Sequence, residues 1–410
     1  MSRPPLHLFE AFGVELEYMI VDRESLAVKP IADQLMRAAV GEEAIEATFG
    51  PIGWSNELVL HVVELKTANP EPSLEVLPEW FAENVAAVER LLEPLGARLL
   101  PSGAHPLMDP ARETRLWPHE NNEIYRAYDR IFGCRGHGWS NLQSAHLNLP
   151  FADDAEFAKL HTAIRLVLPL IPGLAASTPL YDGVATGVLD RRLEVYQRNQ
   201  ARVPLITGLV VPEAVTSRAA YHERILEPIW AAIAPLDPDG ILQYEWLNSR
   251  GAIGRFERGS IEIRIVDLQE CPLADVAILA AIVAVVRAIA SERWLALDEQ
   301  LELATERLAA VYQRAVRDAD AAVVDEPELL RAFSLESSRS LTIGEIWSTL
   351  IAELIPESSR FRAILDEIVG LGPLARRRFR AIGEPLRHER IREVYRELAA
   401  CLDDQRLFRP

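Results

Sequence analysis

Two carboxylates, Glu15 and Glu17, alternate with apolar residues in the segment 13–21 (Gly-Val-Glu-Leu-Glu-Tyr-Met-Ile-Val). Side chains two apart on a β-strand project from the same face, so a strand here would hold both carboxylates side by side. Neighbouring like charges raise each other's pKa, which disfavours such a pair unless a cation joins it. Hard divalent cations bind oxygen ligands of this kind. The segment therefore indicates either part of a metal site or the solvated face of an amphipathic strand.

Two further segments repeat this alternation and favour the first interpretation. The segment 260–267 places Glu262 and Arg264 opposite three isoleucines, and the segment 144–149 places His146 opposite Ala and Leu residues. A purely solvated face of an antiparallel sheet would mix Lys, Thr, Ser and Glu without preference. These strands instead offer carboxylates, one imidazole and one arginine. We therefore predict that one face of an antiparallel sheet forms a site for metal and phosphate.

A fourth segment, 57–67, carries Glu57 and Glu64 in a run rich in β-branched residues. The two positions differ in parity, so a regular strand cannot show both on one face. Either a bulge lies between them, or one of them belongs to a preceding turn at 53–56. The predicted site therefore includes Glu57, Glu64 or both.

A basin of carboxylates with one His and one Arg can hold two or more Mg²⁺ or Mn²⁺ ions. Such ions would bridge the phosphates of a nucleotide, while arginines neutralise the charge that develops during phosphoryl transfer. Arginines outside the four segments that are candidates for this role are Arg191, Arg192, Arg198, Arg202, Arg250 and Arg255. For the run from 191 to 202, phosphate or carboxylate binding and a solvated helix surface remain open.

The composition excludes several classes of protein. With 410 residues, 49% hydrophobic and 25% charged, the chain is typical of a globular protein with a large core. Its net charge of −18 argues against nucleic acid or an anionic membrane as a partner. The cysteines lie far apart and form no disulfide or zinc pattern, so each is expected to be a small buried residue: Cys134, Cys271 and Cys401.

The chain shows no signal for export or membrane insertion. Residues 1–5 lead into the first strand without an apolar signal segment, and the longest apolar stretch, 272–286, is interrupted by Asp275. We expect that stretch to form a buried helix. The sequence therefore predicts a cytoplasmic protein and leaves a homo-oligomer open.

The elements that must position these residues suggest an α+β fold with a mainly antiparallel sheet. The expected strands cover 11–21, 57–67, 97–103, 143–149, 243–248, 253–257 and 261–267. The expected helices in the first part cover 78–95, 120–131, 154–171 and 217–234. Beyond residue 273 the pattern is helical, over 275–295, 297–318, 343–354, 360–369 and 388–402. We predict a catalytic domain over 1–290 and a helical region over 291–410 packed on the same domain.

Two further segments have simpler interpretations. The basic stretch 376–380 (Arg-Arg-Arg-Phe-Arg) is expected to be a solvated helix face or a region of salt bridges between helices. The segment 133–138 (Gly-Cys-Arg-Gly-His-Gly) lacks the spacing of a dinucleotide fingerprint and is expected to be a loop or turn that closes over a substrate. A P-loop, an HExxH motif and a GxSxG elbow are all missing from the sequence.

Four short motifs occur in an informative order along the chain. They lie at 13–17 (Gly-Val-Glu-Leu-Glu), 102–106 (Ser-Gly-Ala-His-Pro), 176–183 (Ala-Ser-Thr-Pro, then Gly) and 262–267 (Glu-Ile-Arg-Ile-Val-Asp). In order and spacing over about 10–290, the chain resembles the bacterial carboxylate–amine ligases of the second glutamate–cysteine ligase type.

The resemblance implies a glutamine-synthetase-like fold, in which a curved, mainly antiparallel sheet forms a funnel for metals and ATP. It implies that ATP phosphorylates a carboxylate, classically that of glutamate, and that an amine such as cysteine then attacks the acyl phosphate. By the same resemblance, the metal ligands are Glu15, Glu17, Glu57, Glu64, His146 and Glu262. Glu15, Glu262 and Arg264 are expected to act in catalysis, and the nucleotide contacts are Arg264, Arg192, Arg198 and Arg255.

Three departures from the family pattern leave the identity of the substrates open. The family often has His-Val-His-Val where this chain has Ser-Ala-His-Leu at 144–147, and it tends to have glycine where Asn148 stands. An arginine often found soon after the position of Gly183 is missing, with Gly187 in its region. The acid and the amine could therefore differ from glutamate and cysteine. The alternatives are a phosphagen-kinase-like enzyme, another amino-acid ligase, and a non-catalytic regulator that binds metal or a metabolite.

Overall fold

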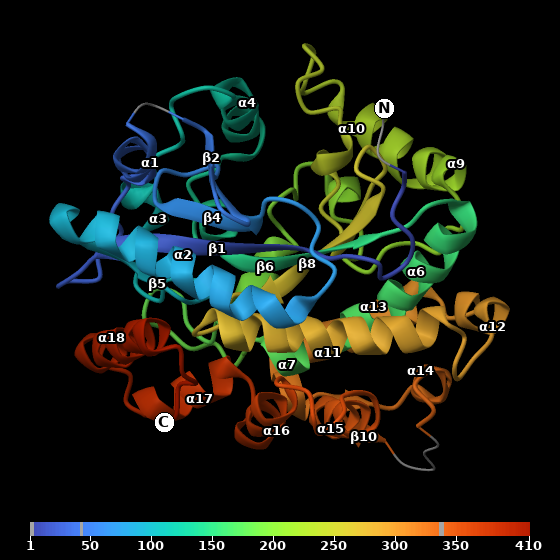
Figure 1. Cartoon of the computed structure of the whole chain (residues 1–410). Coiled ribbons are helices and arrows are strands. Elements are labelled where there is room, and N and C mark those ends of the chain that lie inside the picture. Colours follow the sequence, from blue (N-terminus) through green and yellow to red (C-terminus); the bar gives the residue numbers. More distant parts are fainter. Residues whose placement is uncertain (1–3, 42–43, 336–339) are drawn as a thin grey trace.

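The computed structural model describes residues 4–41, 44–335 and 340–410; the start of the chain at Met1–Arg3, for which the sequence predicted only the lack of a signal segment, lies outside them. One antiparallel sheet dominates the first two thirds of the chain (Figure 1). Its strands lie in the order β2-β3-β4-β1-β6-β8-β7, and β5 pairs with the far end of β1. The strands are β1 (Gly13–Asp22), β2 (Glu46–Phe49), β3 (Ile52–Asn56), β4 (Val62–Thr67), β5 (Ala97–Leu100), β6 (Ser144–Pro150), β7 (Ala252–Arg255) and β8 (Ser260–Asp267).

The alternation in the sequence determines which face of the sheet is buried. Val14, Leu16 and Tyr18 of β1 are fully buried, while Glu15 and Glu17 between them are only partly covered. Helices α2 (Leu77–Leu92), α6 (Asp154–Val167) and α11 (Pro272–Ala290) carry residues of the same hydrophobic core. The predicted α+β class with an antiparallel sheet is thus confirmed. The face of the sheet opposite the hydrophobic core carries Glu15 and Glu17 and is available for a binding site.

Helix α11 is the buried helix predicted at 272–286. Its length and hydropathy would suffice to cross a membrane, but 83% of its most apolar stretch is buried within the protein. Asp275 near its start is fully buried and accepts a hydrogen bond from the backbone N–H of Gln269 at 2.8 Å. The helix therefore serves as the central core helix on which α2 and α6 pack.

The remaining helices are mostly short and surround this core. They are α1 (Ala32–Val40), α3 (Pro110–Glu113), α4 (Asn122–Phe132), α5 (His137–Ser140), α7 (Pro172–Ala175), α8 (Arg191–Tyr196), α9 (Arg218–Tyr221), α10 (Glu227–Ile233), α12 (Leu297–Leu301), α13 (Thr305–Asp318), α14 (Pro327–Ala332), α15 (Ile343–Leu354), α16 (Arg362–Leu371), α17 (Leu374–Ile382) and α18 (His388–Asp404). Two very short strands, β9 (Val323–Val324) and β10 (Leu341–Thr342), pair with each other.

Several predicted elements differ from the observed ones. The strand expected at 243–248 is wrong, because its residues form a loop with the 3₁₀ turn Glu245–Leu247. The hairpin of β2 and β3 was missed. The helix expected at 217–234 consists of α9, a π-helical turn (His222–Leu226) and α10, and the one expected at 297–318 is broken into α12 and α13.

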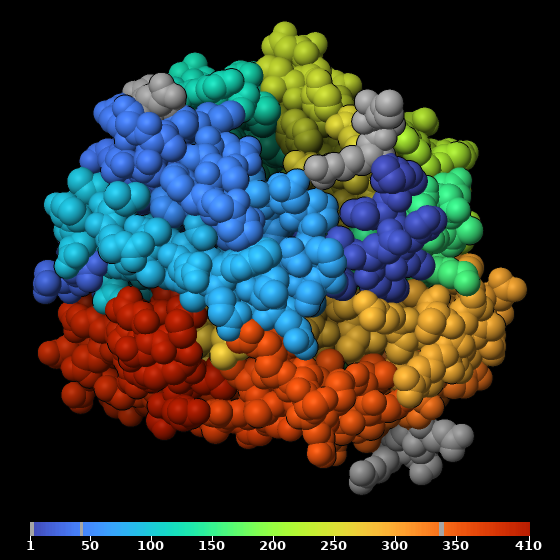
Figure 2. All heavy atoms as spheres, viewed as in Figure 1, coloured from blue at the N-terminus to red at the C-terminus, as the bar shows by residue number. Residues whose placement is uncertain are grey.

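The C-terminal helices lie along the side of the core that faces away from β2 and α4 (Figures 1 and 2). Residues of α13, α15 and α16 belong to the same hydrophobic cluster as β1 and α11. In α17, the expected solvated face is wrong for Arg377 and Arg378, because both are fully buried. Arg377 forms a buried ion pair with Glu270, so the alternative prediction of salt bridges is the better one for this segment.

Candidate active site

A cavity of about 380 Å³ opens on the face of the sheet opposite the core. In the surface view the molecule is hollowed between α4, in teal, and the yellow-green residues that follow α10 (Figure 2). Nearly all the residues predicted to act lie on the wall of this cavity: Glu15, Glu17, Glu57, Glu64, His146, Arg192, Arg255, Glu262 and Arg264. The antiparallel sheet brings together side chains that are up to 249 positions apart in the sequence, Glu15 and Arg264 being the extremes.

One predicted nucleotide contact lies elsewhere. Arg198 is exposed and does not line the cavity, so the expectation that it contacts the nucleotide is corrected. Arg198 follows α8, and the helix turns Arg192 inward while it leaves Arg198 on the surface. Of the other candidates, Arg250 is buried in an ion pair with Glu213, and Arg202 donates to the backbone oxygen of Ile131.

The strand register explains how the carboxylates meet. Glu17 of β1 lies opposite Glu64 of β4, and Glu15 lies opposite His146 of β6. Glu57 lies in the turn between β3 and β4, outside both strands, which resolves its conflict of parity with Glu64. The turn begins at Glu57 rather than at 53–56, because Gly53 to Asn56 belong to β3.

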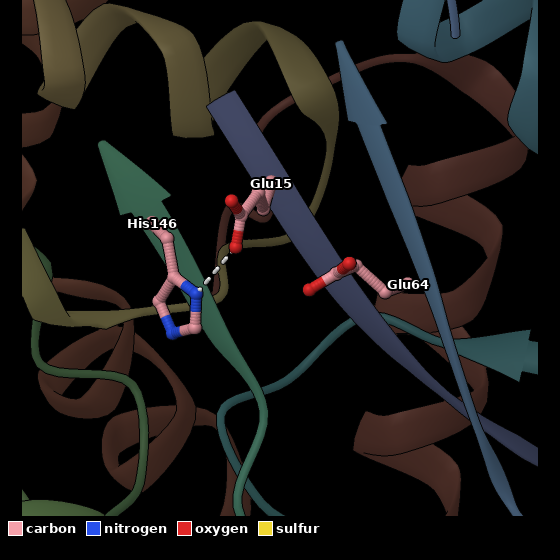
Figure 3. Close-up of side chains that lie close together, drawn as sticks. All are labelled: Glu15, Glu64 and His146. Carbon is pink, nitrogen blue, oxygen red and sulfur yellow. Dashed lines mark hydrogen bonds and ion pairs between the residues drawn. The ribbon is translucent and has the colours of Figure 1, made fainter. Parts of the chain in front are cut away.

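His146 is held by hydrogen bonds on both sides of its ring. Its Nδ1 lies 2.9 Å from Oε2 of Glu15, and its Nε2 lies 2.9 Å from Oγ of Ser144 (Figure 3 draws the first contact). Ser144 in turn donates to Oε2 of Glu17 from its hydroxyl group, at 2.9 Å. Burial lowers the pKa of His146, but the hydrogen bond that its ring donates to Glu15 and the charges of Glu17 and Glu15 outweigh it and raise the pKa to about 9. The free protein therefore holds an imidazolium among its carboxylates.

The carboxylates form two overlapping groups that share Glu64. Ligand atoms of Glu15, Glu64 and His146 lie within 4.8 Å of one another, and so do those of Glu17, Glu57 and Glu64. Burial, followed by the charges of Glu64 and Glu17, raises the pKa of Glu57 well above its ordinary value. Burial and the charge of Glu15 raise the pKa of Glu64 to about 7, although Lys66 lies 3.3 Å away.

This set of donors fits divalent cations. Oxygen ligands from several carboxylates together with one imidazole nitrogen suit Mg²⁺ or Mn²⁺, and burial with neighbouring like charges raises the pKa values of Glu57 and Glu64, which a bound cation would offset. The sharing of Glu64 is geometrically compatible with two neighbouring ions. For His146 to bind one, its ring must lose a proton and exchange a present hydrogen bond for the metal.

Glu262 has a different environment from the other carboxylates. Its Oε1 accepts a hydrogen bond from Arg264 at 2.6 Å, and its Oε2 accepts one from Arg255 at 2.6 Å. Burial raises the pKa of Glu262, but the charges of Arg264, His146 and Arg255 overcome it and lower the pKa below the ordinary range. Glu262 belongs to neither group of potential ligands among the described residues, so its role as a metal ligand stays a prediction.

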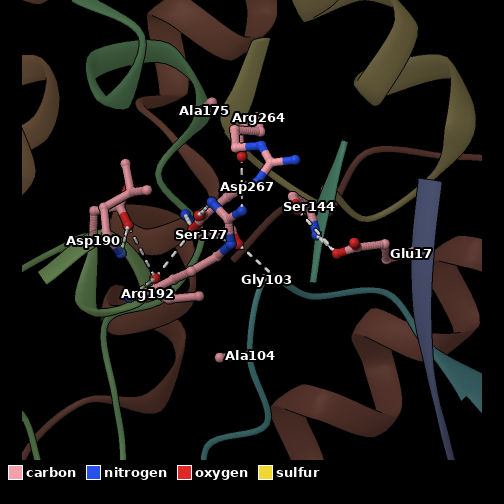
Figure 4. A network of polar contacts seen from close by, with 12 residues as sticks. Glu17, Gly103, Ala104, Ser144, Ala175, Ser177, Asp190, Arg192, Arg264 and Asp267 are labelled. Carbon is pink, nitrogen blue, oxygen red and sulfur yellow. Dashed lines mark hydrogen bonds and ion pairs between the residues drawn. The ribbon is translucent and has the colours of Figure 1, made fainter. Parts of the chain in front are cut away.

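A buried polar network behind the sheet supports Arg264 (Figure 4). Arg192 donates to the backbone oxygen of Arg264 at 3.0 Å and to Oδ1 of Asp267 at 3.2 Å. The other oxygen of Asp267 accepts hydrogen bonds from the N–H and hydroxyl groups of Ser177 and from the hydroxyl group of Thr178. Asp267, the last residue of the motif at 262–267, is fully buried, so it anchors Arg192 and takes no direct part in the cavity.

Several residues of the cavity were not found from the sequence. Lys66 lies two positions after Glu64 on β4, so the period of the strand could have identified it. Arg258 follows β7 in the turn that leads to β8. An aromatic side of the cavity comes from α4, α5 and the turn before β7, where no strand pattern marks it: Tyr125, Tyr128, Trp139 and Trp246.

The segment 133–138, which was expected to form a loop over the substrate, is only partly a loop. Residues 137–140 form the short helix α5, and Gly138 lines the cavity. The Asn199 side chain donates to the backbone oxygen of Gly138 and fills the space that a larger residue would need. The segment is therefore packed against the rim of the site through Asn199.

Comparisons with known proteins identify the family of this chain. The model of a family described as Glutamate-cysteine ligase family 2 matches residues 11–397. An uncharacterized protein of Archaeoglobus fulgidus is 39% identical over 276 residues, which cover 67% of this chain and 74% of that protein. A Corynebacterium glutamicum protein, provisionally named glutamate–cysteine ligase 2, is 23% identical over 263 residues, which cover 62% of this chain and 61% of that protein.

A solved structure shows the same fold. The glutamate–cysteine ligase of Francisella tularensis, in complex with AMP, superposes with a TM-score of 0.61 over 99% of this chain and 90% of that chain, at 10% identity. The superposition confirms the α+β fold expected from the resemblance. The sheet is open rather than closed into a barrel, because β2 and β7 form its two edges.

Proposed function

Because the chain belongs to glutamate–cysteine ligase family 2, we propose that it is an ATP-dependent ligase that joins a carboxylate to an amine. The observation that carries this proposal is the pair of acidic groups that share Glu64 beside the arginines of β7 and β8. ATP and Mg²⁺ or Mn²⁺ are the proposed cofactors. The proposed substrates are glutamate, or another small carboxylic acid, and cysteine or another amine.

The proposed reaction has two steps. An oxygen of the substrate carboxylate attacks the γ-phosphorus of ATP, the bond from that phosphorus to the bridging oxygen breaks, and ADP leaves. The nitrogen of the amine then attacks the carbonyl carbon of the acyl phosphate, loses a proton, and displaces phosphate to leave an amide. Both steps move negative charge that nearby cations and hydrogen-bond donors can stabilise in a partly enclosed cavity.

The proposed metal ligands are Glu15, Glu64 and His146 for one ion and Glu17, Glu57 and Glu64 for the other. When bound, the ions would neutralise the phosphates and orient the reacting phosphoryl group. Ser144 would keep Glu17 in place, because both its N–H and its hydroxyl group donate to that carboxylate. This arrangement supports roles for Glu15 and Glu17 that a solvated strand face would not require.

The arginines have separate proposed tasks. Arg264 and Arg255 are proposed to contact phosphate, and Glu262, held between them, sets the direction of both guanidinium groups. Arg192 is proposed to contact the nucleotide from the cavity wall while it anchors the backbone of Arg264. We propose that residues 1–290 form the catalytic part and that residues 291–410 support it from behind the sheet.

A phosphate-release assay with ATP, Mg²⁺, glutamate and a panel of amines tests this function. We expect phosphate release only when an acid and an amine are both present, with an amide product identified by mass spectrometry. A stable phosphorylated product without an amine would instead indicate a kinase. Intact ATP with every pair of acid and amine would contradict the proposed activity.

A further inference from the structure

Lys66 places an ammonium group beside the carboxylate that both acidic groups share. Its Nζ lies 3.3 Å from Oε1 of Glu64, two positions earlier on β4, and both side chains line the cavity. The strand register also places Lys66 opposite Glu15 of β1. An ammonium group has donors and no acceptor, so Lys66 cannot be a metal ligand. It lies instead where a cation bound by Glu64 would meet a like charge.

Glu46 of β2 offers Lys66 a second partner, outside the acidic groups. The same Nζ lies 3.6 Å from Oε1 of Glu46, so the ammonium group stands between two carboxylates. Gly53 of β3 leaves the space in which they meet, because a Cβ there would lie 3.6 Å from Oε1 of Glu46 and 3.7 Å from Cγ of Lys66. The Glu46 side chain is 55% exposed and that of Glu64 is 8% exposed. Lys66 therefore has one buried and one exposed partner within reach.

The charge beside Glu64 determines which partner is favoured. The Glu64 carboxylate points from β4 toward β1, and its ligand oxygen lies within 4.8 Å of those of Glu15 and Glu17 (Figure 3 draws Glu15 and Glu64). Without a metal, this cluster attracts the ammonium group. A divalent cation on the same carboxylate would repel it, strongly so in a partly enclosed cavity. Glu64 would keep its position, because the hydroxyl group of Ser55 donates to its Oε1 at 2.9 Å.

We propose that Lys66 is an internal counter-cation, which pairs with Glu64 in the metal-free protein and moves to Glu46 when a divalent cation binds. The inference rests on the metal site of the proposed function and adds a positioning residue to it. Lys66 holds the crowded carboxylates together while the site is empty. A free cation must displace its ammonium group, so Lys66 also lowers the affinity of the site for that cation.

Binding of Mn²⁺ to the whole protein without nucleotide, measured by calorimetry at constant pH and low ionic strength, tests the inference. Lys66→Met removes the charge and keeps an apolar stem, so this variant should bind Mn²⁺ at least about 10-fold more tightly than the wild-type protein. Its melting temperature without metal should be lower, because Glu64 loses its counter-cation. Mn²⁺ should then raise the melting temperature of the variant by more than that of the wild-type protein.

Glu46→Gln tests the second partner. Lys66 would lose the group that receives it, so the affinity for Mn²⁺ should fall, by up to about fivefold. In a Lys66→Met background the same change should leave the affinity unchanged, because no ammonium group remains to be received. A fall that persists in the double variant would show that Glu46 acts by its own charge, which overturns the movement of Lys66 to Glu46.

Lys159→Met is the matched control for the loss of a lysine charge. Lys159 pairs with Glu292 at 2.9 Å and lies outside the cavity, so this variant should bind Mn²⁺ like the wild-type protein. An equal gain in affinity in Lys159→Met and Lys66→Met would overturn the inference, because the gain would follow from net charge alone.

The outcomes separate this inference from the ligase function. Equal or weaker binding of Mn²⁺ by Lys66→Met overturns the counter-cation, and phosphate release by the wild-type protein would leave the ligase intact. A wild-type protein and variants that all fail to bind Mn²⁺ contradict the metal site and the counter-cation together. Tighter binding by Lys66→Met, in a protein that turns over no ATP, supports the counter-cation and contradicts the ligase.

Discussion

Carboxylates occur both in the cavity and in the buried network behind the sheet, but their partners differ between the two regions. Behind the sheet, Asp267 and Glu270 are fully buried, and each receives an arginine and further N–H or hydroxyl donors from the chain. In the cavity, burial and the charges of Glu64 and Glu17 raise the pKa of Glu57, and burial and the charges of Glu15 and Glu17 raise the pKa of Glu64. The first set is satisfied by donors within the protein, whereas the second is crowded with like charges.

We propose that this difference separates residues that maintain the fold from residues that bind ligands. Removing a carboxylate from a paired set leaves a buried arginine without a partner, which is strongly destabilising. Removing one from a crowded set relieves repulsion and leaves no buried cation without a partner. Activity and stability should therefore respond in opposite ways in the two regions, and each of the following variants tests that expectation.

The largest effect is expected from the carboxylate that both acidic groups share. Glu64→Gln should lower kcat by at least about 100-fold, because it removes a ligand of both proposed ions. The free energy of unfolding should stay equal or rise, since an amide does not repel Glu15 and Glu17. Denaturant unfolding and a turnover assay check both parts. A variant that loses stability and keeps its turnover would place Glu64 with the structural set.

Arg264→Lys tests a residue that belongs to both regions, because Arg264 lines the cavity and its backbone is held by Arg192 of the network. Lysine cannot reproduce the planar fork that Arg264 presents to Glu262, so kcat/KM should fall by about 10- to 100-fold with a small change in stability. Arg293→Lys, at an exposed ion pair with Glu353, is the comparison for a change on the surface. Similar kinetics for both variants would contradict the proposed phosphate contact.

Asp267→Asn is expected to have the largest effect on stability. The buried guanidinium group of Arg192 would lose its charged partner, which should lower the free energy of unfolding by about 3 kcal/mol. The melting temperature of the purified variant measures this loss. An unchanged melting temperature would show that the network behind the sheet is not a structural one.

The stability of the metal-free protein should fall as the pH rises, because His146, Glu64 and Glu57 all have pKa values raised above their ordinary ones. The contribution tested here is that of His146. Its pKa rises from 6.5 to about 9 on folding, so the stabilisation is fully present below pH 6.5 and is lost as the pH rises through 9. Metal binding requires the neutral ring, so the affinity for Mg²⁺ should increase over the same range. Unfolding at pH 6.5, 8 and 9, with and without Mg²⁺, checks both slopes. His146→Gln should make both slopes shallower while Glu64 and Glu57 keep their own contributions, and slopes that are unchanged in this variant would assign the titration to other groups.

The smallest effect is expected at Arg198. It is exposed and lies outside the cavity, so Arg198→Ala should leave the KM for ATP unchanged and alter stability by less than about 0.5 kcal/mol. Steady-state kinetics at varied ATP concentration are the measurement. A severalfold rise in this KM would restore Arg198 as a nucleotide contact.

The sequence predicted the face of each strand well, because alternation is a local property. Glu15, Glu17, His146 and Arg264 could be selected without knowledge of which strands pair. Their convergence could be expected from the antiparallel class but not measured, since the register of distant strands depends on the whole core. The placement of Glu57 in a turn likewise required the hairpin of β3 and β4.

The failures have physical causes that lie outside local patterns. The segment 243–248 alternates like a strand, but Asp237 accepts hydrogen bonds from the N–H groups of Ile241 and Leu242 just before it. These bonds hold the chain in a loop, and the segment pairs with no described strand. The burial of Arg377 and Arg378 could not be read from a basic stretch either, because their partners, such as Glu270 and Ser102, lie more than 100 residues away.

The binding of divalent cations by the acidic cavity is the central claim, and Mn²⁺ tests it most directly. A crystal of the protein with Mn²⁺ and a non-hydrolysable ATP analogue should show anomalous density between β1, β4 and β6. We predict ions at about 2.2 Å from oxygens of Glu64, with Glu15 and His146 around one and Glu17 and Glu57 around the other. An analogue bound in the cavity with its Mn²⁺ held away from all of these carboxylates would contradict the account.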